Sequence, residues 1–177
     1  MNIPTFTIND FLPVMPVGVL MGGAIVLMLS EVFLTPAKTG SPPNGVAGLQ
    51  PNRTYMAVLS ALTAAVAGAI AMHNAFEPAR AVLQGYAVLD PFSSWTTVLV
   101  CVATFLASFL SSGFLKHRNA ERGEFYALVL FAAAGMSLLA LSAEFITLFI
   151  NLEVLSIATY ALTAFLRRGP RPSEAGF

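Results

Sequence analysis

The residue whose type and position are best suited to chemistry is Glu153, an acidic side chain inside a long apolar stretch. It is the only charged residue in the 22 positions from 145 to 166. At 100° per residue, a helix over this stretch brings three hydroxyl residues to within about 80° of the Glu153 side chain, namely Ser156, Tyr160 and Thr163. Burial and neighbouring charges set the protonation of such a carboxyl group. The pattern predicts a site for proton transfer or ion pairing at Glu153, supported by this polar stripe.

The depth of Glu153 determines what its charge costs. It lies eight residues into the stretch, about 12 Å along a helix that rises 1.5 Å per residue, near the middle of a hydrocarbon core roughly 30 Å thick. A charge at that depth costs on the order of 3 kcal/mol on insertion scales. The surrounding aliphatic and aromatic side chains offset this cost at roughly 0.3–0.6 kcal/mol each. We interpret Glu153 as functional; the alternative is a protonated glutamate that only hydrogen-bonds a neighbouring helix.

The composition indicates that this stretch lies in a membrane. Of the 177 residues, 56% are hydrophobic and only 10% are charged, whereas about a quarter are charged in an ordinary soluble domain. Disorder is excluded, since disordered chains are rich in charge. A single cysteine excludes a disulfide framework and a cysteine-based metal site, and nine basic against nine acidic residues leave no basic footprint for nucleic acid. We therefore expect an integral membrane protein without a disulfide framework, a cysteine-based metal site or a nucleic-acid partner.

The charged residues divide the chain into five stretches of membrane length. About 20 apolar residues span the hydrocarbon core, and every backbone group must be paired there, so each stretch is expected to be helical. The alternating pattern of barrel strands is absent. The predicted fold class is an all-α integral membrane protein. Its five transmembrane helices are predicted at about 13–34, 54–76, 92–113, 124–143 and 145–166.

The connections group these helices into two segments. A two-helix segment is predicted over 1–85, and a three-helix segment over 86–177 that ends in a basic tail at 167–177. Asp90 followed by Pro91 predicts a capped start for the third helix. The connection between the fourth and fifth helices is so short that we expect them to be antiparallel neighbours.

Basic residues predict the orientation across the membrane. With five spans, the first loop, the third loop and the C-terminal tail share one side, which carries eight of the nine Lys and Arg residues. The other side carries only Arg80. The positive-inside rule places the eight-residue side in the cytoplasm, so the N-terminus faces outside and the C-terminus is cytoplasmic. No Lys or Arg precedes Lys38, so the basic region of a signal peptide is missing and we expect the first helix to be retained.

Other candidate residues have simpler interpretations. His73 and His117 are far apart in the sequence and are interpreted as interfacial or solvated, with His117 in the basic third loop. Glu31, near the end of the first helix, is expected to extend toward the interface. Cys101 is interpreted as a small apolar filler.

Two patterns of small residues predict close helix contact. Gly18 and Gly22 form a GxxxG pair in the first helix. Ala61, Ala65 and Ala69 form a stripe in the second helix. Small side chains let two helix backbones approach each other in a membrane, so we expect both patterns to lie at helix interfaces.

Residues 86–177 resemble a known family, subunit N of bacterial NADH-quinone oxidoreductase. The resemblance covers that family's third and fourth helices, its glutamate-bearing fifth helix and the cytoplasmic loop that follows. It is carried by residues 90–93 (DPFS), 123–136 (beginning GEFYAL), 148–162 (LFINLEVLSIATYAL), 167–168 and 173–175. Over 1–85, the similarity extends to helix number, polarity and a proline-rich first loop.

The resemblance implies an antiporter-like subunit of respiratory complex I, of which this chain corresponds to the first third. Such subunits have some fourteen helices built around two inverted five-helix repeats and lie in the bacterial plasma (inner) membrane. They translocate protons beside other membrane subunits of the complex, carry no redox cofactor, and depend on quinone only indirectly. Glu153 matches the family's fifth-helix glutamate, which pairs with a lysine two helices later. The implied enzyme class is a non-redox membrane subunit of a translocase.

The chain departs from the family in its extent. It stops at Phe177, before the sixth helix, and its predicted spans contain no Lys or Arg. Glu153 therefore has no cationic partner inside these spans, and we expect the isolated chain not to pump protons. Two alternatives remain open, namely a related subunit of a multisubunit cation/proton antiporter and a non-transporting five-helix assembly or scaffold protein.

Overall fold

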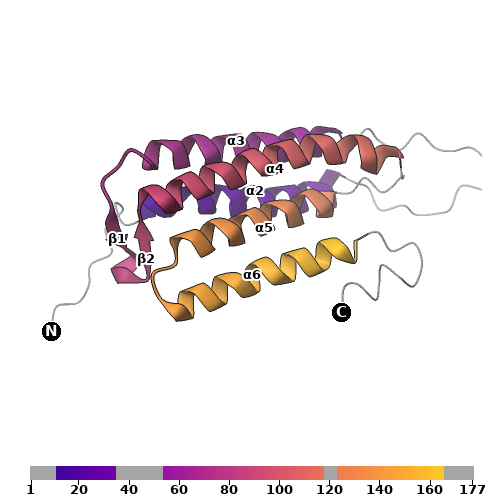
Figure 1. The fold of residues 1–177 in the computed structure, drawn as a ribbon. Helices are drawn as coiled ribbons and strands as arrows, with labels where there is room; N and C mark the ends of the chain where they lie inside the picture. Colours follow the sequence, from indigo (N-terminus) through magenta and orange to yellow (C-terminus); the bar gives the residue numbers. More distant parts are fainter. Residues whose placement is uncertain (1–10, 35–53, 118–122, 166–177) are drawn as a thin grey trace, which may run out of the picture.

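The computed structural model describes residues 11–34, 54–117 and 123–165. Five long helices dominate these residues and run side by side (Figure 1). All five are long and apolar enough to cross a membrane, which confirms the predicted fold class. In chain order the elements are η1 (Leu12–Val14), α2 (Met15–Leu34), α3 (Thr54–Asn74), β1 (Arg80–Val82), η2 (Leu83–Gly85), β2 (Ala87–Leu89), α4 (Pro91–His117), α5 (Gly123–Leu141) and α6 (Phe145–Thr163).

Four of the helices, α2 to α5, form a bundle, and α6 packs on its outside, chiefly against α5 (Figure 1). The bundle core contains large side chains with no exposed surface, among them Leu20, Met56, Tyr126 and Leu130. The antiparallel arrangement of α5 and α6, joined by only three residues, confirms the prediction from their short connection. The two helices are nonetheless in different surroundings, because α5 is enclosed by the bundle and α6 lies at its edge.

Small and hydroxyl residues form the contact between α3 and α4. The buried face of α4 includes Thr97, Thr104 and Ser108, and each of these side chains donates a hydrogen bond to the carbonyl oxygen four residues earlier. Ser60 of α3 lies 2.9 Å from Ser108, oxygen to oxygen. Since Ser108 already donates to Thr104, Ser60 is the donor in this contact. These hydroxyls are satisfied without water, as a membrane interior requires.

The small-residue predictions are confirmed only in part. Gly18 and Gly22 are exposed, and a Cβ added at either position would meet no atom of the described residues within 4 Å. The close contact of α2 lies instead at Gly23, where an added Cβ would overlap the side chain of Thr63. The buried face of α2 thus passes through Gly23, and the GxxxG spacing alone did not reveal which face that was.

The alanine stripe of α3 follows a different line from the one predicted. Ala61 is buried, but Ala65 and Ala69 are exposed. A face that stays in contact with a neighbour advances by a mixture of three-residue and four-residue steps, whereas constant steps of four drift around the helix. The alanines buried along α3 follow the first rule: Ala57, Ala61, Ala64, Ala67 and Ala71.

Helix ends differ from the predicted ones by a few residues. Helix α4 continues through Gly113 and ends at His117, so His117 is the last residue of a helix and not part of a loop. Glycine is common inside transmembrane helices, which explains why Gly113 does not end this one. Helices α3, α5 and α6 end two or three residues earlier than predicted, within the usual variation of helix ends. The predicted basic tail at 167–177 lies outside the described residues.

The start of α4 has the predicted cap. The backbone N–H of Ser93 donates to Asp90 Oδ1 at 2.7 Å, and the backbone N–H of Asp90 donates to Ser93 Oγ at 3.1 Å. This reciprocal pair, with Pro91 as the first helical residue, satisfies donors that a helix start leaves unpaired. The capping interpretation of Asp90 and Pro91 is confirmed.

A short hairpin between α3 and α4 was not predicted. Strands β1 and β2 pair antiparallel, with Val82 opposite Ala87. The turn holds Leu83, Gln84 and Gly85 at φ values of 50°, 60° and 97°. Positive φ is uncommon for leucine and glutamine, and strands of three residues carry little periodicity, so no pattern in these residues predicts the hairpin. The hairpin lies near residue 85, where the two segments were predicted to divide, and that division stays a prediction.

The hairpin is tied to the turn between α5 and α6. Ala87 forms an isolated bridge with Ser142. The carbonyl oxygen of Tyr86 accepts hydrogen bonds from the Ala143 backbone N–H at 3.2 Å and from Thr147 Oγ1 at 3.3 Å. These contacts fix the start of α6 to the end of the bundle that carries the hairpin.

Candidate functional site

Helix α6 presents Glu153 on a face that no described helix covers. Glu153 is exposed, with no hydrogen bond or ion pair to its carboxyl group among residues 11–34, 54–117 and 123–165. Tyr160 and Thr163 are also exposed, and Ser156 is half-buried. The structure therefore places the four predicted site residues along the uncovered side of α6, about halfway along and toward the end of the helix.

The four residues do not form one hydrogen-bonded network in the described structure. Ser156 Oγ donates to the carbonyl oxygen of Leu152 at 2.8 Å. Thr163 Oγ1 donates to the carbonyl oxygen of Tyr160, also at 2.8 Å. Each hydroxyl is thus satisfied by its own helix, and neither is oriented by Glu153. The polar stripe is a shared face and not a chain of linked groups.

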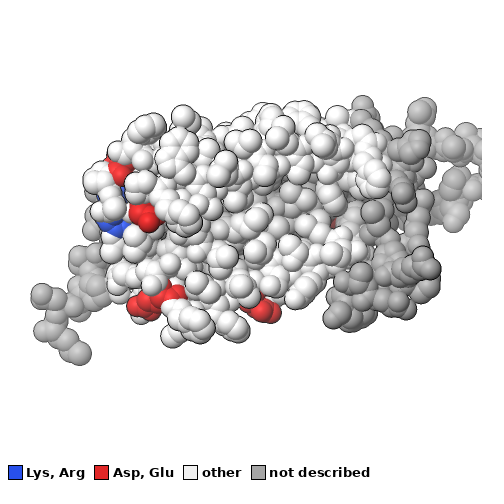
Figure 2. Space-filling view, in the orientation of Figure 1, with Lys and Arg blue, Asp and Glu red and all other residues white. Residues whose placement is uncertain are grey.

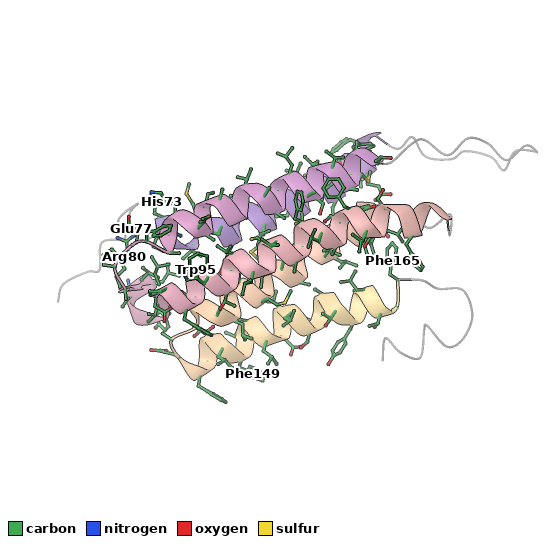
Figure 3. All side chains as sticks on the ribbon, turned by 45° about the horizontal axis from the view of Figure 1, so that its top comes forward. His73, Glu77, Arg80, Trp95, Phe149 and Phe165 are labelled. Carbon is green, nitrogen blue, oxygen red and sulfur yellow. The ribbon has the colours of Figure 1, made fainter. Side chains whose placement is uncertain are left out.

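The surface around Glu153 is apolar. Its neighbours on the uncovered face are Phe149, Ile150 and Ile157, which are 59%, 54% and 58% exposed. Figure 3 shows Phe149 on α6, pointing away from the other helices. Glu153 is therefore an isolated acidic group on an apolar surface. A charge in such surroundings is strongly affected by any cation brought near it, because little water is present to screen the interaction.

The other charged side chains are concentrated elsewhere. Among the described residues on the face drawn in Figure 2, most charge lies at the end of the bundle that carries β1 and β2, and the flank of the helices is almost uncharged. His73, Glu77 and Arg80 lie at that end, beside Trp95 (Figure 3). Arg80 is the one basic side chain of Lys or Arg that the structure describes, and no described cation contacts Glu153.

Two contacts with α5 determine which way Glu153 faces. Asn151 Nδ2 donates to the carbonyl oxygen of Leu138 at 3.1 Å and to Ser142 Oγ at 2.8 Å. One turn further, the backbone of Leu155 lies against Gly135, where an added Cβ would come within 3.0 Å of the Leu155 Cα atom. Asn151 and Leu155 flank Glu153 at two residues on either side. The sequence analysis did not identify Asn151 or Gly135, although an amide inside an apolar span signals an interhelical hydrogen bond.

Glu31 has a role that its sequence position did not reveal. Its Oε2 atom accepts a hydrogen bond of 2.9 Å from the backbone N–H of Glu124, in the first turn of α5. Gly123 makes room for this contact, because an added Cβ would lie 2.6 Å from Glu31 Oε2 and 2.5 Å from Met56 Sδ. An anion at a helix N-terminus is favourable. Glu31 thus joins the end of α2 to the start of α5.

The remaining candidates agree with structural roles. Cys101 is buried and lies against Gly68, as expected of a small filler. His73 is exposed in the last turn of α3. Within the described ranges, no three His, Cys, Asp or Glu residues gather in a way that could hold a metal ion.

A small cavity lies at the hairpin end of the bundle. Its volume of about 10 Å³ is at the lower end of the roughly 10–15 Å³ that one water molecule requires. Asn74, Ser94, Thr97 and Leu141 are among the lining residues, and none of the four predicted site residues is. This cavity is too small for an organic substrate.

Comparison with known proteins places the chain among membrane subunits of one kind. No protein-family model matches it. It is 54% identical over 177 residues to NADH-quinone oxidoreductase subunit N of Myxococcus xanthus. It is 30% identical over 171 residues to subunit N of Thioalkalivibrio sulfidiphilus and 34% identical over 157 residues to subunit N of Sphingopyxis alaskensis.

These matches cover 100%, 97% and 88% of the chain, but only 32%, 33% and 29% of the three relatives. The chain therefore spans about a third of the length of the curated relatives it matches. The similarity also includes the first 85 residues, where the sequence alone offered only helix number, polarity and a proline-rich loop.

Proposed function

The chain belongs to the family of NADH-quinone oxidoreductase subunit N, and we propose that it acts as the N-terminal portion of a proton-translocating subunit of that complex. In this role it is a non-redox membrane component of the bacterial inner membrane. Its partners are the other membrane subunits of complex I and the surrounding lipid. Protons are the transported species, and quinone is connected to this subunit only through the rest of the complex.

The observation that carries this proposal is the position of Glu153. It lies about halfway along α6, on an uncovered apolar face and apart from every other described charge. An ionisable group at that depth is costly, and such groups in membrane proteins are usually functional. One carboxyl group can hold one proton, so Glu153 supplies a single station on a proton path.

The chemistry at Glu153 follows from its surroundings. Glu153 lies on an apolar surface formed by Phe149 and Ile157, where a nearby charge is little screened. When a cationic side chain approaches, the charged carboxylate is favoured and the proton leaves. Formation and loss of such a pair would therefore load and unload a proton at the Glu153 carboxyl oxygen. The chain supplies the carboxyl group, and the cation must come from another part of the complete subunit.

The length of the relatives supports this division of roles. About two thirds of the length of each relative lies beyond the matched part. That remaining chain is available to cover the exposed face of α6 and to provide the cation. The 177 residues alone offer Glu153 no cation within a span, so the isolated chain should not translocate protons.

The test is Glu153→Gln in the full-length subunit, assembled in its complex and reconstituted in vesicles. Glutamine keeps the size and polarity of the side chain but cannot release a proton, so proton translocation should fall at least about tenfold, which corresponds to about 1.4 kcal/mol in a barrier. Glu77→Gln, at the hairpin end and outside the predicted path, is the matched control. Wild-type translocation by Glu153→Gln would exclude the proposed role.

The second candidate function is a non-transporting assembly or scaffold role, in which Glu153 is protonated and packed against a neighbouring helix. The absence of a cationic partner for Glu153 within the described residues favours this alternative over an independent transporter. It predicts that Glu153→Gln leaves translocation unchanged but lowers the amount of assembled complex. Measurement of both quantities in the same preparation separates the two roles.

A further inference from the structure

We propose that Asn151 and Gly135 are positioning residues that hold Glu153 directed away from α5, toward the part of the subunit beyond α6. The assignment rests on the proposed function of Glu153 and names the groups that give this carboxyl group its direction. Neither residue contacts the carboxyl group. Both act through the rotation of α6 about its own axis.

Rotation of α6 is not determined by its polarity. Large apolar side chains are exposed on several sides of the helix: Ile146, Leu148, Phe149, Ile150, Leu152 and Ile157. In a membrane such a helix gains nothing by turning one apolar face inward, since lipid is equally apolar. Specific contacts must therefore select one rotation.

The first such contact is a closed group of hydrogen bonds at the end of α5. Asn151 Nδ2 donates to both the Leu138 carbonyl oxygen and Ser142 Oγ, and Ser142 Oγ donates to the same carbonyl oxygen at 2.9 Å. The Asn151 amide and the Ser142 hydroxyl thus share the Leu138 carbonyl oxygen as acceptor. The Ser142 hydroxyl donates one hydrogen bond and accepts another. Turning Asn151 away from α5 would leave its amide without these acceptors in a region without water.

The second contact is the fit of Leu155 against Gly135. The distance from a Cβ built on Gly135 to the Leu155 backbone nitrogen would be 3.0 Å, so the two backbones are close enough that only glycine fits without displacement. Ala158, three residues further, is buried on the same side of α6. The contact line of α6 on α5 therefore runs from Asn151 through Leu155 to Ala158.

The direction of Glu153 follows from these two contacts. Residues two positions apart on a helix are separated by about 200° around its axis. Glu153 is two positions from both Asn151 and Leu155, so it lies within about 20° of the point opposite each of them. A change in the contact line by a single residue would rotate the carboxyl group by about 100°. Asn151 and Gly135 thus fix where the approaching cation must come from.

The experiment uses the full-length subunit in its complex, with two readouts. The first is proton translocation by vesicles. The second is the pH dependence of Glu153 labelling by a hydrophobic carbodiimide, which reacts with protonated carboxyl groups in apolar surroundings. The labelling profile reports the environment of the carboxyl group itself. A general loss of stability in the assembled complex would not change this profile.

Asn151→Leu removes the hydrogen bonds at similar side-chain volume. We expect the labelling profile to differ from that of the wild type and translocation to fall several-fold. Thr159→Val is the matched control, because Thr159 bonds only to carbonyl oxygens of α6 itself. Both readouts should stay at wild-type values in this control.

Two milder variants keep the inference testable if Asn151→Leu fails to assemble. Ser142→Ala removes one of the two acceptors of Asn151, and Gly135→Ala displaces Leu155 by a few tenths of an ångström; both should shift the labelling profile less than Asn151→Leu does. One outcome overturns the positioning role and leaves the proposed function standing. In that outcome Glu153→Gln abolishes translocation, but the labelling profile and translocation are unchanged in Ser142→Ala, Gly135→Ala and any assembled Asn151→Leu. If Glu153→Gln is itself active, the proposed function fails, and the labelling profile alone decides the positioning role.

Discussion

Helices α5 and α6 are adjacent, antiparallel and almost equally apolar, yet their surroundings differ completely. Of the most apolar stretch of each helix, 50% of the residues are buried in α5 and only 6% in α6. Helix α5 contributes Tyr126, Leu130 and Ala133 to the core with no exposed surface, whereas Ala158 is the one buried residue of α6. Helix α5 is thus enclosed by described neighbours. Helix α6, which carries Glu153, has a side that no described helix covers.

In a membrane protein, the apolarity of a helix therefore does not reveal whether other helices surround it. A soluble chain with as many exposed apolar residues as α6 would be expected to associate. In lipid, both sides of α6 are compatible with the solvent, so only packing contacts distinguish an inner helix from an outer one. Three sets of substitutions test that contrast, and the expected change in free energy decreases from one to the next.

Truncation of a side chain should cost far more in the bundle than on α6. Leu130 has no exposed surface, and Ile157 is 58% exposed. Leu130→Ala should lower the free energy of unfolding of the chain in detergent by roughly 2–3 kcal/mol, because a cavity remains in the core. Ile157→Ala should change it by less than about 0.5 kcal/mol. Denaturation of the two variants side by side checks the contrast, and equal losses would mean that α6 is enclosed after all.

Removal of the Glu31 carboxylate should weaken the bundle to an intermediate degree. Glu31→Ala deletes the acceptor at the start of α5, and we expect a loss of about 1 kcal/mol in the free energy of unfolding. Glu31→Gln, which keeps the size of the side chain and an acceptor oxygen but removes the charge, should lose less than Glu31→Ala. Glu77→Ala is the control and should have little effect. Equal losses for Glu31→Gln and Glu31→Ala would indicate that the charge alone explains the contribution of Glu31.

The smallest effect concerns hydroxyl groups. A double-mutant cycle with Ser60→Ala and Ser108→Ala should give a coupling of about 0.6 kcal/mol, the average for interhelical hydrogen bonds in a membrane protein. The same cycle with Ser156→Ala and Thr159→Ala on α6 should give a coupling near zero, because each hydroxyl bonds to a carbonyl of its own helix. Similar couplings in both cycles would contradict the difference between the two regions.

The features that follow from composition could be predicted from the sequence. Charge-free stretches of membrane length located five helices, and the pairing of Asp90 with Pro91 located the start of α4. The length of an apolar stretch and the hydrogen bonds of the Asp90 cap both depend on residues close together in the chain. The resemblance to subunit N likewise rested on contiguous segments, and the whole-chain match confirmed it.

The features that depend on which helix faces which could not be predicted. Gly18 and Gly22 have the spacing of a contact pair but lie on the exposed side of α2, while Gly23 makes the contact. Asn151 was missed because its acceptors, a carbonyl oxygen and a serine on α5, become apparent only when the two helices are docked. The assignment of Glu153 to proton transfer stays a prediction, since no described cation contacts its carboxyl group.

The bridge between the hairpin and the α5–α6 turn has a mechanical consequence. Because Ala87 and Tyr86 hold Ser142 and Ala143, the first residues of α6 are attached to the hairpin, and a tilt that separates Leu155 from Gly135 would turn α6 about that attached end. A tilt of about 10° would carry the far end of the helix, near Thr163, through about 5 Å, and Glu153 through about 2 Å. Because the attached end is closer to Glu153 than to Thr163, a displacement at the far end of α6 becomes a smaller displacement at the carboxyl group. That smaller displacement is comparable to the difference between a formed and a broken ion pair.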